Sequence, residues 1–168
     1  GAVNLSPNST PEVSQTMMTS GIEANVGSPA SGSLPMTDPL KSGSCSARLG
    51  NGQADGGGES LSYKWTVTAA NNSFTYDFAV VMLNSVGTHT GSQEPYFQIQ
   101  MWYFNSPTDS VDLACGDYYV TPTSATGFLN GASNGILYKP WSSVTVPLDP
   151  YIGKQVRITF TTRDCCPS

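Results

Sequence analysis

A glycine-rich stretch, residues 51–59 (NGQADGGGE), holds the residue types best suited to a metal ion. Asp55 and Glu59 supply carboxylates, and hard cations such as Ca²⁺ prefer several oxygens from carboxylates and loop carbonyls. Glycines let the backbone turn its carbonyls inward. The spacing matches neither the EF-hand loop nor the RTX nonapeptide. Asp55 and Glu59 are therefore the predicted ligands of a Ca²⁺ site, with Ca²⁺ the one candidate cofactor; the alternative is a glycine loop that binds nothing.

Aromatic residues predict a second kind of site, a sugar-binding platform. In the alternating run 96–103 (YFQIQMWY), Tyr96 and Trp102 fall on the face opposite Phe97, Ile99 and Met101. Exposed rings there could stack on the flat apolar faces of sugars. Further candidates are Tyr118, Tyr119 and Trp141. The alternative is that a second sheet or the N-terminal segment covers both faces of this strand.

The four cysteines, Cys45, Cys115, Cys165 and Cys166, contain no C-x-x-C pair. With a single histidine in the chain they cannot form a zinc site of ordinary spacing. An even number of cysteines in a charge-poor, Ser/Thr-rich chain indicates disulfides and an oxidising compartment. A bond between neighbouring cysteines is strained, which favours pairing one of Cys165 and Cys166 with Cys45 and the other with Cys115. The alternative is that one or more are free thiols.

No catalytic residues are predicted. The one histidine, His89, lies in the turn-rich stretch 87–91, and the chain has no G-x-S-x-G elbow. A Ser-His or Cys-His nucleophile pair therefore has no support in the sequence. Paired carboxylates can hydrolyse glycosides at a separation of roughly 5–10 Å, and Glu59 and Glu94 are the glutamates of the strand region. We expect such carboxylates to be solvated or to form turns, and the protein not to be an enzyme.

Composition narrows the class of protein further. The 168 residues suit one domain, at about 100–200 residues each. Charged residues make up 11%, against about 25% in an average soluble domain. The net charge of −5, with no Lys/Arg cluster, argues against a nucleic-acid partner. No apolar stretch approaches the roughly 20 residues of a membrane span, and any export signal is expected to have been removed.

The chain divides into two parts by composition. Residues 1–44 are dense in Ser, Pro, Gly and Thr without apolar periodicity, which indicates an extended arm or linker. The arm is laid either against its own domain or against a neighbouring chain. From residue 45 onward, apolar residues recur with period two, and no window shows a helical stripe. The predicted strands are 61–68, 74–83, 96–103, 111–113, 118–121, 135–138, 143–148 and 155–162.

These seven or eight short strands, separated by turns, predict an all-β fold, an antiparallel β-sandwich at 45–168. Several strings within it are distinctive, among them SCSARLGN (44–51), FAVVM (78–82), QEPYF (93–97), VTVPLDPYIGKQVRI (144–158) and TTRDC (161–165). Together they resemble a jelly-roll-like module of very large surface and secreted proteins of Bacteroidetes, which carry type IX secretion signals, PKD-like repeats and adhesin architectures. The resemblance runs from about residue 44 to the end. It implies an extracellular, disulfide-bearing β-sandwich with no assigned catalytic residues.

The chain departs from that module after Asp164-Cys165. There the module continues with a glycine-rich turn, a histidine and a final aromatic strand, whereas this chain ends at Ser168. A sandwich without its last strand has an edge of unpaired N–H and C=O groups. We expect either a fragment of a longer protein or a sheet completed by a strand from another segment or chain through β-augmentation. The arm at 1–44 is a candidate donor.

The sequence thus predicts a non-catalytic extracellular β-sandwich module that acts in adhesion or assembly at a bacterial cell surface. In that reading it is a fibre or filament subunit, joined by strand exchange to copies of itself or to neighbouring domains. The alternative is a carbohydrate-binding module of a larger secreted hydrolase or adhesin, with surface glycans as partners. Neither reading involves nucleic acid or a membrane span.

Overall fold

A computed structural model describes residues 15–27, 34–39, 45–50, 57–84, 87, 89 and 91–165. Within these ranges the chain forms ten strands, four 3₁₀-helices and no α-helix. The strands are β1 (Gln15–Met18), β2 (Ser46–Leu49), β3 (Gly58–Thr66), β4 (Ser73–Leu83), β5 (Tyr96–Ser106), β6 (Asp109–Asp112), β7 (Tyr118–Val120), β8 (Leu129–Asn130), β9 (Ile136–Pro147) and β10 (Gln155–Arg163). The 3₁₀-helices are η1 (Gly91–Gln93), η2 (Ala114–Gly116), η3 (Pro122–Ser124) and η4 (Asp149–Tyr151). None of the helices in these ranges is long and apolar enough to cross a membrane.

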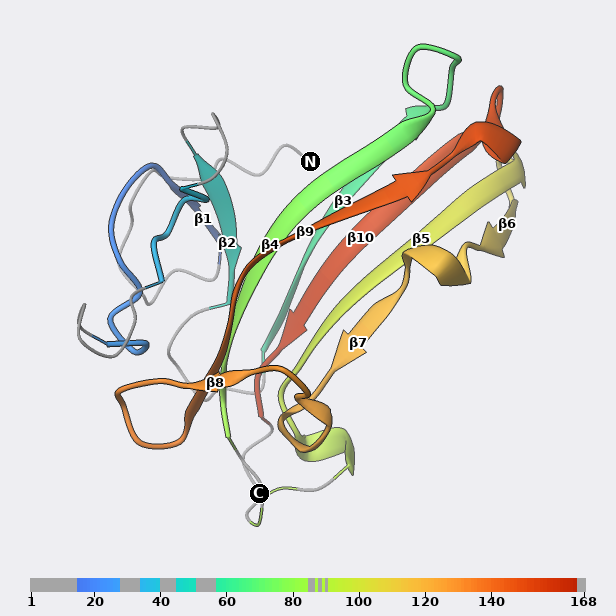
Figure 1. Cartoon of the computed structure of the whole chain (residues 1–168). Helices are drawn as coiled ribbons and strands as arrows, with labels where there is room; N and C mark the ends of the chain where they lie inside the picture. The colour runs from blue at the N-terminus through green and yellow to red at the C-terminus, as the bar shows by residue number, and fades with distance from the viewer. Residues whose placement is uncertain are drawn as a thin grey trace.

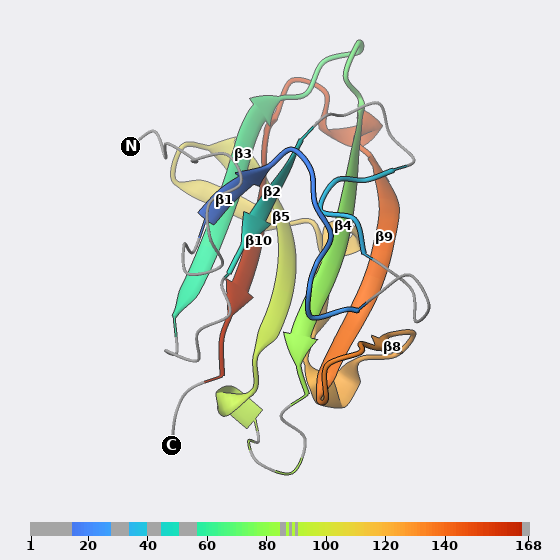
Figure 2. The ribbon, with the colours of Figure 1, turned by 90° about the vertical axis from the view of Figure 1, so that its left-hand side faces the viewer.

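Two antiparallel sheets face each other, which confirms the predicted all-β sandwich (Figure 1). The large sheet has the order β3-β10-β5-β6, with β7 also paired to β5. The small sheet has the order β4-β9-β8. A third, separate ladder joins β1 to β2 and lies on the side where β3 and β4 form the sheet edges (Figure 2).

The core lies between the two sheets and follows from strict alternation along the strands. In the large sheet Ile99, Met101, Val156 and Ile158 are fully buried. Phe78, Val80 and Met82 face them from β4 and belong to the same cluster. Because successive side chains of a strand point to opposite faces, this burial sends every second residue of β5 and β10 outward, away from the core.

The strand count is ten among the described residues, against the seven or eight predicted. β1, β2 and β8 are too short to show a period-two pattern. In the other direction, the strands predicted at 135–138 and 143–148 are one strand, β9. The prediction divided this strand at Pro140, because proline has no N–H to donate to a ladder.

A β-bulge accommodates Pro140. Phe78 pairs with Ser142 and Val80 with Lys139, so Ala79 stands opposite both Pro140 and Trp141. The extra residue changes the alternation of β9. Tyr138, three residues before Trp141, therefore lies with it on the outer face of the small sheet, where both belong to one apolar cluster.

The described parts of the N-terminal arm cover that apolar outer face. Val26 and Leu34 are buried against Tyr138, with Ala79, Val81 and Trp141 packed around them. The indole Nε1 of Trp141 donates to the carbonyl oxygen of Pro35 at 2.8 Å. In Figure 2 the blue N-terminal segment crosses in front of β4. The described parts of the arm thus lie against their own domain, where they cover Ala79 and Val81 on the outer side of the predicted strand at 74–83.

Tyr118, predicted as a sugar-binding residue, lies on the core side of β7. It pairs with Ile99 in register and its ring lies 5.4 Å from that of Phe78. Burial raises the pKa of the Tyr118 phenol above its usual value of 10.0. Pairing with β5 determines which side chains of β7 face the core, and the sequence alone did not show this pairing. The pairing places Tyr119 on the outer face instead.

The covering role of the arm predicts a stability difference between two residues of the same segment. Replacing the buried Leu34 by alanine should lower the free energy of unfolding by about 2–5 kcal/mol, because it removes packed methyl groups and leaves a cavity. Ile22→Ala is the control: Ile22 is 52% exposed, and its replacement should change stability by no more than about 0.5 kcal/mol. Urea unfolding measures both, and equal effects would contradict a structural role for the arm.

The burial of Tyr118 predicts an alkaline effect on stability. Because its pKa is raised in the folded state, the folded protein holds this proton more tightly, and stability falls as the pH rises above about 10. Tyr118→Phe removes the ionisable group, so the variant should lose less stability than the wild type between pH 9 and 11. Thermal unfolding across that range measures the difference; parallel profiles would place Tyr118 outside the core.

Candidate functional site

The outer face of the large sheet carries aromatic and polar side chains on β5, opposite in parity to the buried Phe97, Ile99 and Met101. These side chains are Tyr96, Gln98, Gln100, Trp102 and Phe104. Val26 and Leu34 of the arm pack on the small sheet, and neither view shows another described element over the outer face of the large sheet (Figures 1 and 2). We call this surface the aromatic face.

A row of charged residues crosses the aromatic face at Trp102. By register, Lys64 on β3 pairs with Arg157 on β10, Arg157 with Trp102 on β5, and Trp102 with Asp112 on β6. Directly paired residues of antiparallel strands project to the same side. Two cations, one ring and one carboxylate therefore stand in line across four strands.

Both cations of this row pack against aromatic rings. The guanidinium carbon of Arg157 lies 4.6 Å from the centroid of Trp102 and 5.5 Å from that of Phe104. The Nζ atom of Lys64 lies 4.1 Å from the centroid of Phe104. Cation–π contacts of this kind contribute about 0.5–1 kcal/mol each at exposed sites. These contacts restrict both side chains, so that their charged groups stay against the ring faces.

A tyrosine pair lies at the other end of the face. Tyr119 pairs in register with Gln98, and its ring lies 5.4 Å from that of Tyr96. Tyr119 is 56% exposed. Tyr96 and Phe104 are eight residues apart on one strand, roughly 26 Å at about 3.3 Å per residue. The face is long enough for several sugar rings in a row.

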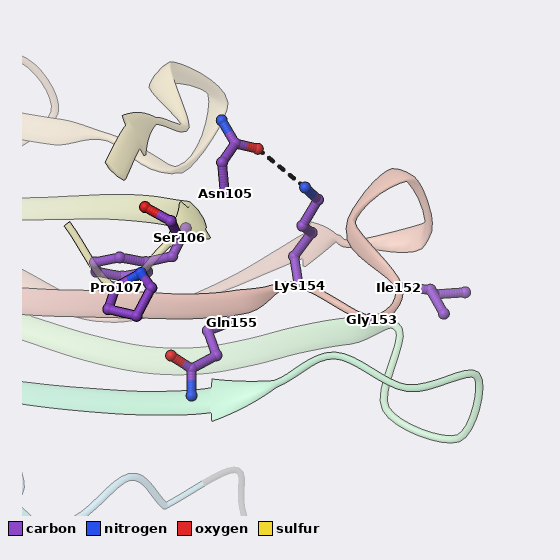
Figure 3. A pocket seen from close by; sticks show the side chains of 8 residues that line it. Asn105, Ser106, Pro107, Ile152, Gly153, Lys154 and Gln155 are labelled. Atoms are coloured by element: carbon purple, nitrogen blue, oxygen red, sulfur yellow. Dashed lines mark hydrogen bonds between the residues drawn. The ribbon is translucent and has the colours of Figure 1, made fainter. Parts of the chain in front are cut away.

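An open hollow of about 450 Å³ adjoins the Phe104 end of this face. Its lining comes from the end of β5 with Pro107 after it, and from the turn before β10 with the first residue of that strand. Figure 3 shows Asn105, Lys154 and Gln155 around it. The Nζ atom of Lys154 donates to Oδ1 of Asn105 at 3.0 Å. The hollow thus adds a third cation and two amide groups to the same end of the aromatic face.

Between the two aromatic ends the face is polar. The hydroxyls of Ser62 and Thr159 lie 2.8 Å apart across β3 and β10, and Gln100 pairs with Thr159 on the next strand. Hydroxyl and amide groups both donate and accept hydrogen bonds. Rings flanked by such groups can stack on the apolar face of a sugar while the polar groups bond its hydroxyls.

The predicted platform residues are thus divided by the structure. Tyr96 and Trp102 lie on the aromatic face, as their parity indicated, and Tyr119 joins them. Tyr118 lies on the core side, and Trp141 lies under the arm. Phe104, Lys64 and Arg157 were not singled out from the sequence. Phe104 continues the parity of Trp102, but the alignment of Lys64 and Arg157 with it depends on strand order.

The predicted calcium ligands cannot be brought together here. Asp55 lies outside the described residues. Glu59, the second residue of β3, lies on the core side of the sheet, and its Oε2 accepts a hydrogen bond from Thr162 Oγ1 at 3.2 Å. Among the described residues no three His, Cys, Asp or Glu side chains gather as a metal site would require. The Ca²⁺ site stays a prediction.

Three of the cysteines, Cys45, Cys115 and Cys165, are free thiols in the structure, while Cys166 lies outside the described residues. Cys45, Cys115 and Cys165 thus form no disulfide with one another in the structure, and the pairings that involve Cys166 stay a prediction. For Cys115 the reason is distance. Its helix η2 packs beside Met101, which pairs with Ile158, seven residues before Cys165. Seven strand residues span roughly 23 Å, and a disulfide needs Cβ atoms about 4 Å apart.

The two glutamates of the strand region both have structural partners. Glu94 is buried and its Oε2 accepts a hydrogen bond from Thr123 Oγ1 at 2.7 Å. Glu59 is bonded to Thr162 as described above. Neither carboxylate lies on the aromatic face or lines the hollow. The expectation of a non-catalytic protein stays a prediction.

Comparison of the chain with models of known protein families, with curated proteins and with solved structures finds no match. The resemblance to a Bacteroidetes surface module therefore stays a prediction.

Proposed function

We propose that the chain is a non-catalytic glycan-binding β-sandwich module that acts in adhesion at a bacterial cell surface. The observation that carries the proposal is the aromatic face: Tyr96, Trp102, Phe104 and Tyr119 share one side of the large sheet with amide and hydroxyl groups. Single aromatic side chains on a surface are ordinary, whereas several gathered on one open face and rimmed by polar groups are typical of a binding surface.

Charge and composition support an extracellular setting. The chain is poor in charged residues, at 11%, and rich in Ser, Thr, Asn and Gly, and its resemblance from residue 44 onward is to secreted and surface modules. Binding on a broad open face rather than in a deep pocket suits a polymer, which can lie along β5 and place successive rings on the aromatic side chains.

Removing Tyr119 should weaken glycan binding. Tyr119→Ala deletes an exposed ring of the platform, and loss of one stacking contact of about 1–2 kcal/mol corresponds to roughly five- to thirtyfold weaker binding. Affinity electrophoresis of the full chain against a panel of polysaccharides, followed by calorimetry on those that bind, measures the change.

Tyr63→Ala is the matched control. Tyr63 is also 56% exposed, but it lies on the core-facing side of β3, beside Trp65 and Phe74. The Tyr63→Ala variant should therefore bind glycans with the same affinity as the wild type. Failure of the wild type to bind any polysaccharide of a broad panel would refute the proposed function, as would equal losses in the two variants.

Assembly through sheet edges is the second candidate function. Among the described residues β3 pairs with β10 alone and β4 with β9 alone, and Leu61 on the edge strand β3 is 41% exposed. Unpaired edges accept strands from other chains. The arm is a poor donor, because its described residues pair with β2 and cover the small sheet of their own chain.

If edges join chains, the mass in solution should rise with concentration, and Leu61→Lys should reverse the rise, since a lysine on an edge strand opposes pairing. Light scattering of wild type and variant from micromolar to millimolar concentration tests this. A wild-type protein that stays monomeric throughout, with no filaments in electron micrographs, would exclude assembly of the isolated chain.

A further inference from the structure

Two cations of the aromatic face stand directly opposite each other without a counter-charge. Lys64 and Arg157 are register partners on β3 and β10, and like charges in this position repel. Among the described residues neither forms an ion pair. The carboxylate of the row, Asp112, is the partner of Trp102 and lies beyond that ring from Arg157. The repulsion in the free protein is therefore a cost that an anion bound between the two side chains would remove.

The side chain of Arg157 is held by ring contacts but lacks a hydrogen-bond partner at Nε. Its Nε is shielded from solvent and has no hydrogen-bond partner among the described residues. Trp102 and Phe104 flank its guanidinium, and ring faces attract a cation without neutralising its charge. Arg157 as a whole is only partly buried, so a ligand can approach its side chain from solvent. The rings thus present a positioned cation to a ligand.

The neighbouring hollow adds a third cation of the same kind. Lys154 Nζ bonds the neutral amide oxygen of Asn105, and the hollow shares Phe104 with the row. Acids lie nearby as well: Asp112 in the row, Asp149 in the turn just before the lining residue Ile152, and Asp109, which accepts a hydrogen bond from the amide of Asn105 at 3.1 Å. Three cations, Lys64, Arg157 and Lys154, thus gather near Phe104 in a chain whose net charge is −5.

We propose that the aromatic face selects acidic polysaccharides, with the carboxylate of a uronic acid seated between Lys64 and Arg157. This inference rests on the proposed glycan binding and names its substrate class. A carboxylate accepts from an arginine fork and a lysine ammonium at once, and paired side chains on neighbouring strands start about 4.5–5.5 Å apart. The rest of the polymer runs along β5 over Gln100 and Thr159 toward Tyr96 and Tyr119.

A matched pair of polymers tests the selection. Polygalacturonate and the same polymer with its carboxyl groups methyl-esterified differ in charge and share their sugar rings. The full chain should bind polygalacturonate at least about tenfold more tightly than the ester, and Arg157→Gln should remove about tenfold or more of that affinity, since charged hydrogen bonds are the stronger class. Lys64→Gln should act in the same direction.

Two further variants separate local recognition from net charge and from misfolding. Lys139→Gln removes one positive charge on the small sheet and should leave binding unchanged. Arg157→Lys keeps the charge and should retain more affinity than Arg157→Gln, with an unaltered melting temperature showing that the variant is folded.

The outcomes distinguish this inference from the proposed function. Equal binding of both polymers, weakened by Tyr119→Ala, overturns the acidic selection and leaves glycan binding in place. No binding of any polysaccharide overturns both. Equal binding of polygalacturonate and single-stranded oligothymidine also overturns the inference, because it shows a response to charge without recognition of a sugar.

Discussion

The antiparallel register between β5 and β10 is the constraint on which the rest of the structure depends. It pairs Ile99 with Phe160 and Met101 with Ile158, which places the apolar side chains of both strands in the core. The same register sets Trp102 beside Arg157 on the outside. A slip of one residue would exchange the two faces of a strand, so burial of Ile99, Met101 and Ile158 fixes the composition of the aromatic face as firmly as it fixes the core.

The outer faces of the two sheets differ in polarity and in whether another segment covers them. Part of the outer side of the small sheet is apolar, at Ala79 and Val81, and the bulge at Pro140 adds Tyr138 and Trp141 to it. Exposed apolar area of that kind needs a cover, and the arm supplies it with Val26 and Leu34. The large sheet has an outer face mixed enough in polarity to remain in water. A glycan-binding role for the module therefore falls on the large sheet, where no described segment competes for the surface.

The basic side chains of the proposed site are ordered before any ligand binds. Long basic side chains lose conformational freedom when they grip a ligand, and contacts made before binding reduce that loss. On the aromatic face the rings of Trp102 and Phe104 already restrict Arg157 and Lys64. In the proposed site the rings then serve two purposes, as surface for sugars and as supports for cations.

The sequence by itself determined the fold class, most of the long strands and the side of β5 on which Tyr96 and Trp102 lie, because period-two alternation is a local property. It divided β9 at Pro140 and assigned Tyr118 to the surface, since a bulge and the parity of a three-residue strand depend on the partner strand. Only the tertiary structure decided that Lys64 on β3, Arg157 on β10 and Trp102 on β5 form one row. Residues 93 positions apart meet through strand order, and strand order is fixed by how the whole chain buries its apolar side chains rather than by any local pattern.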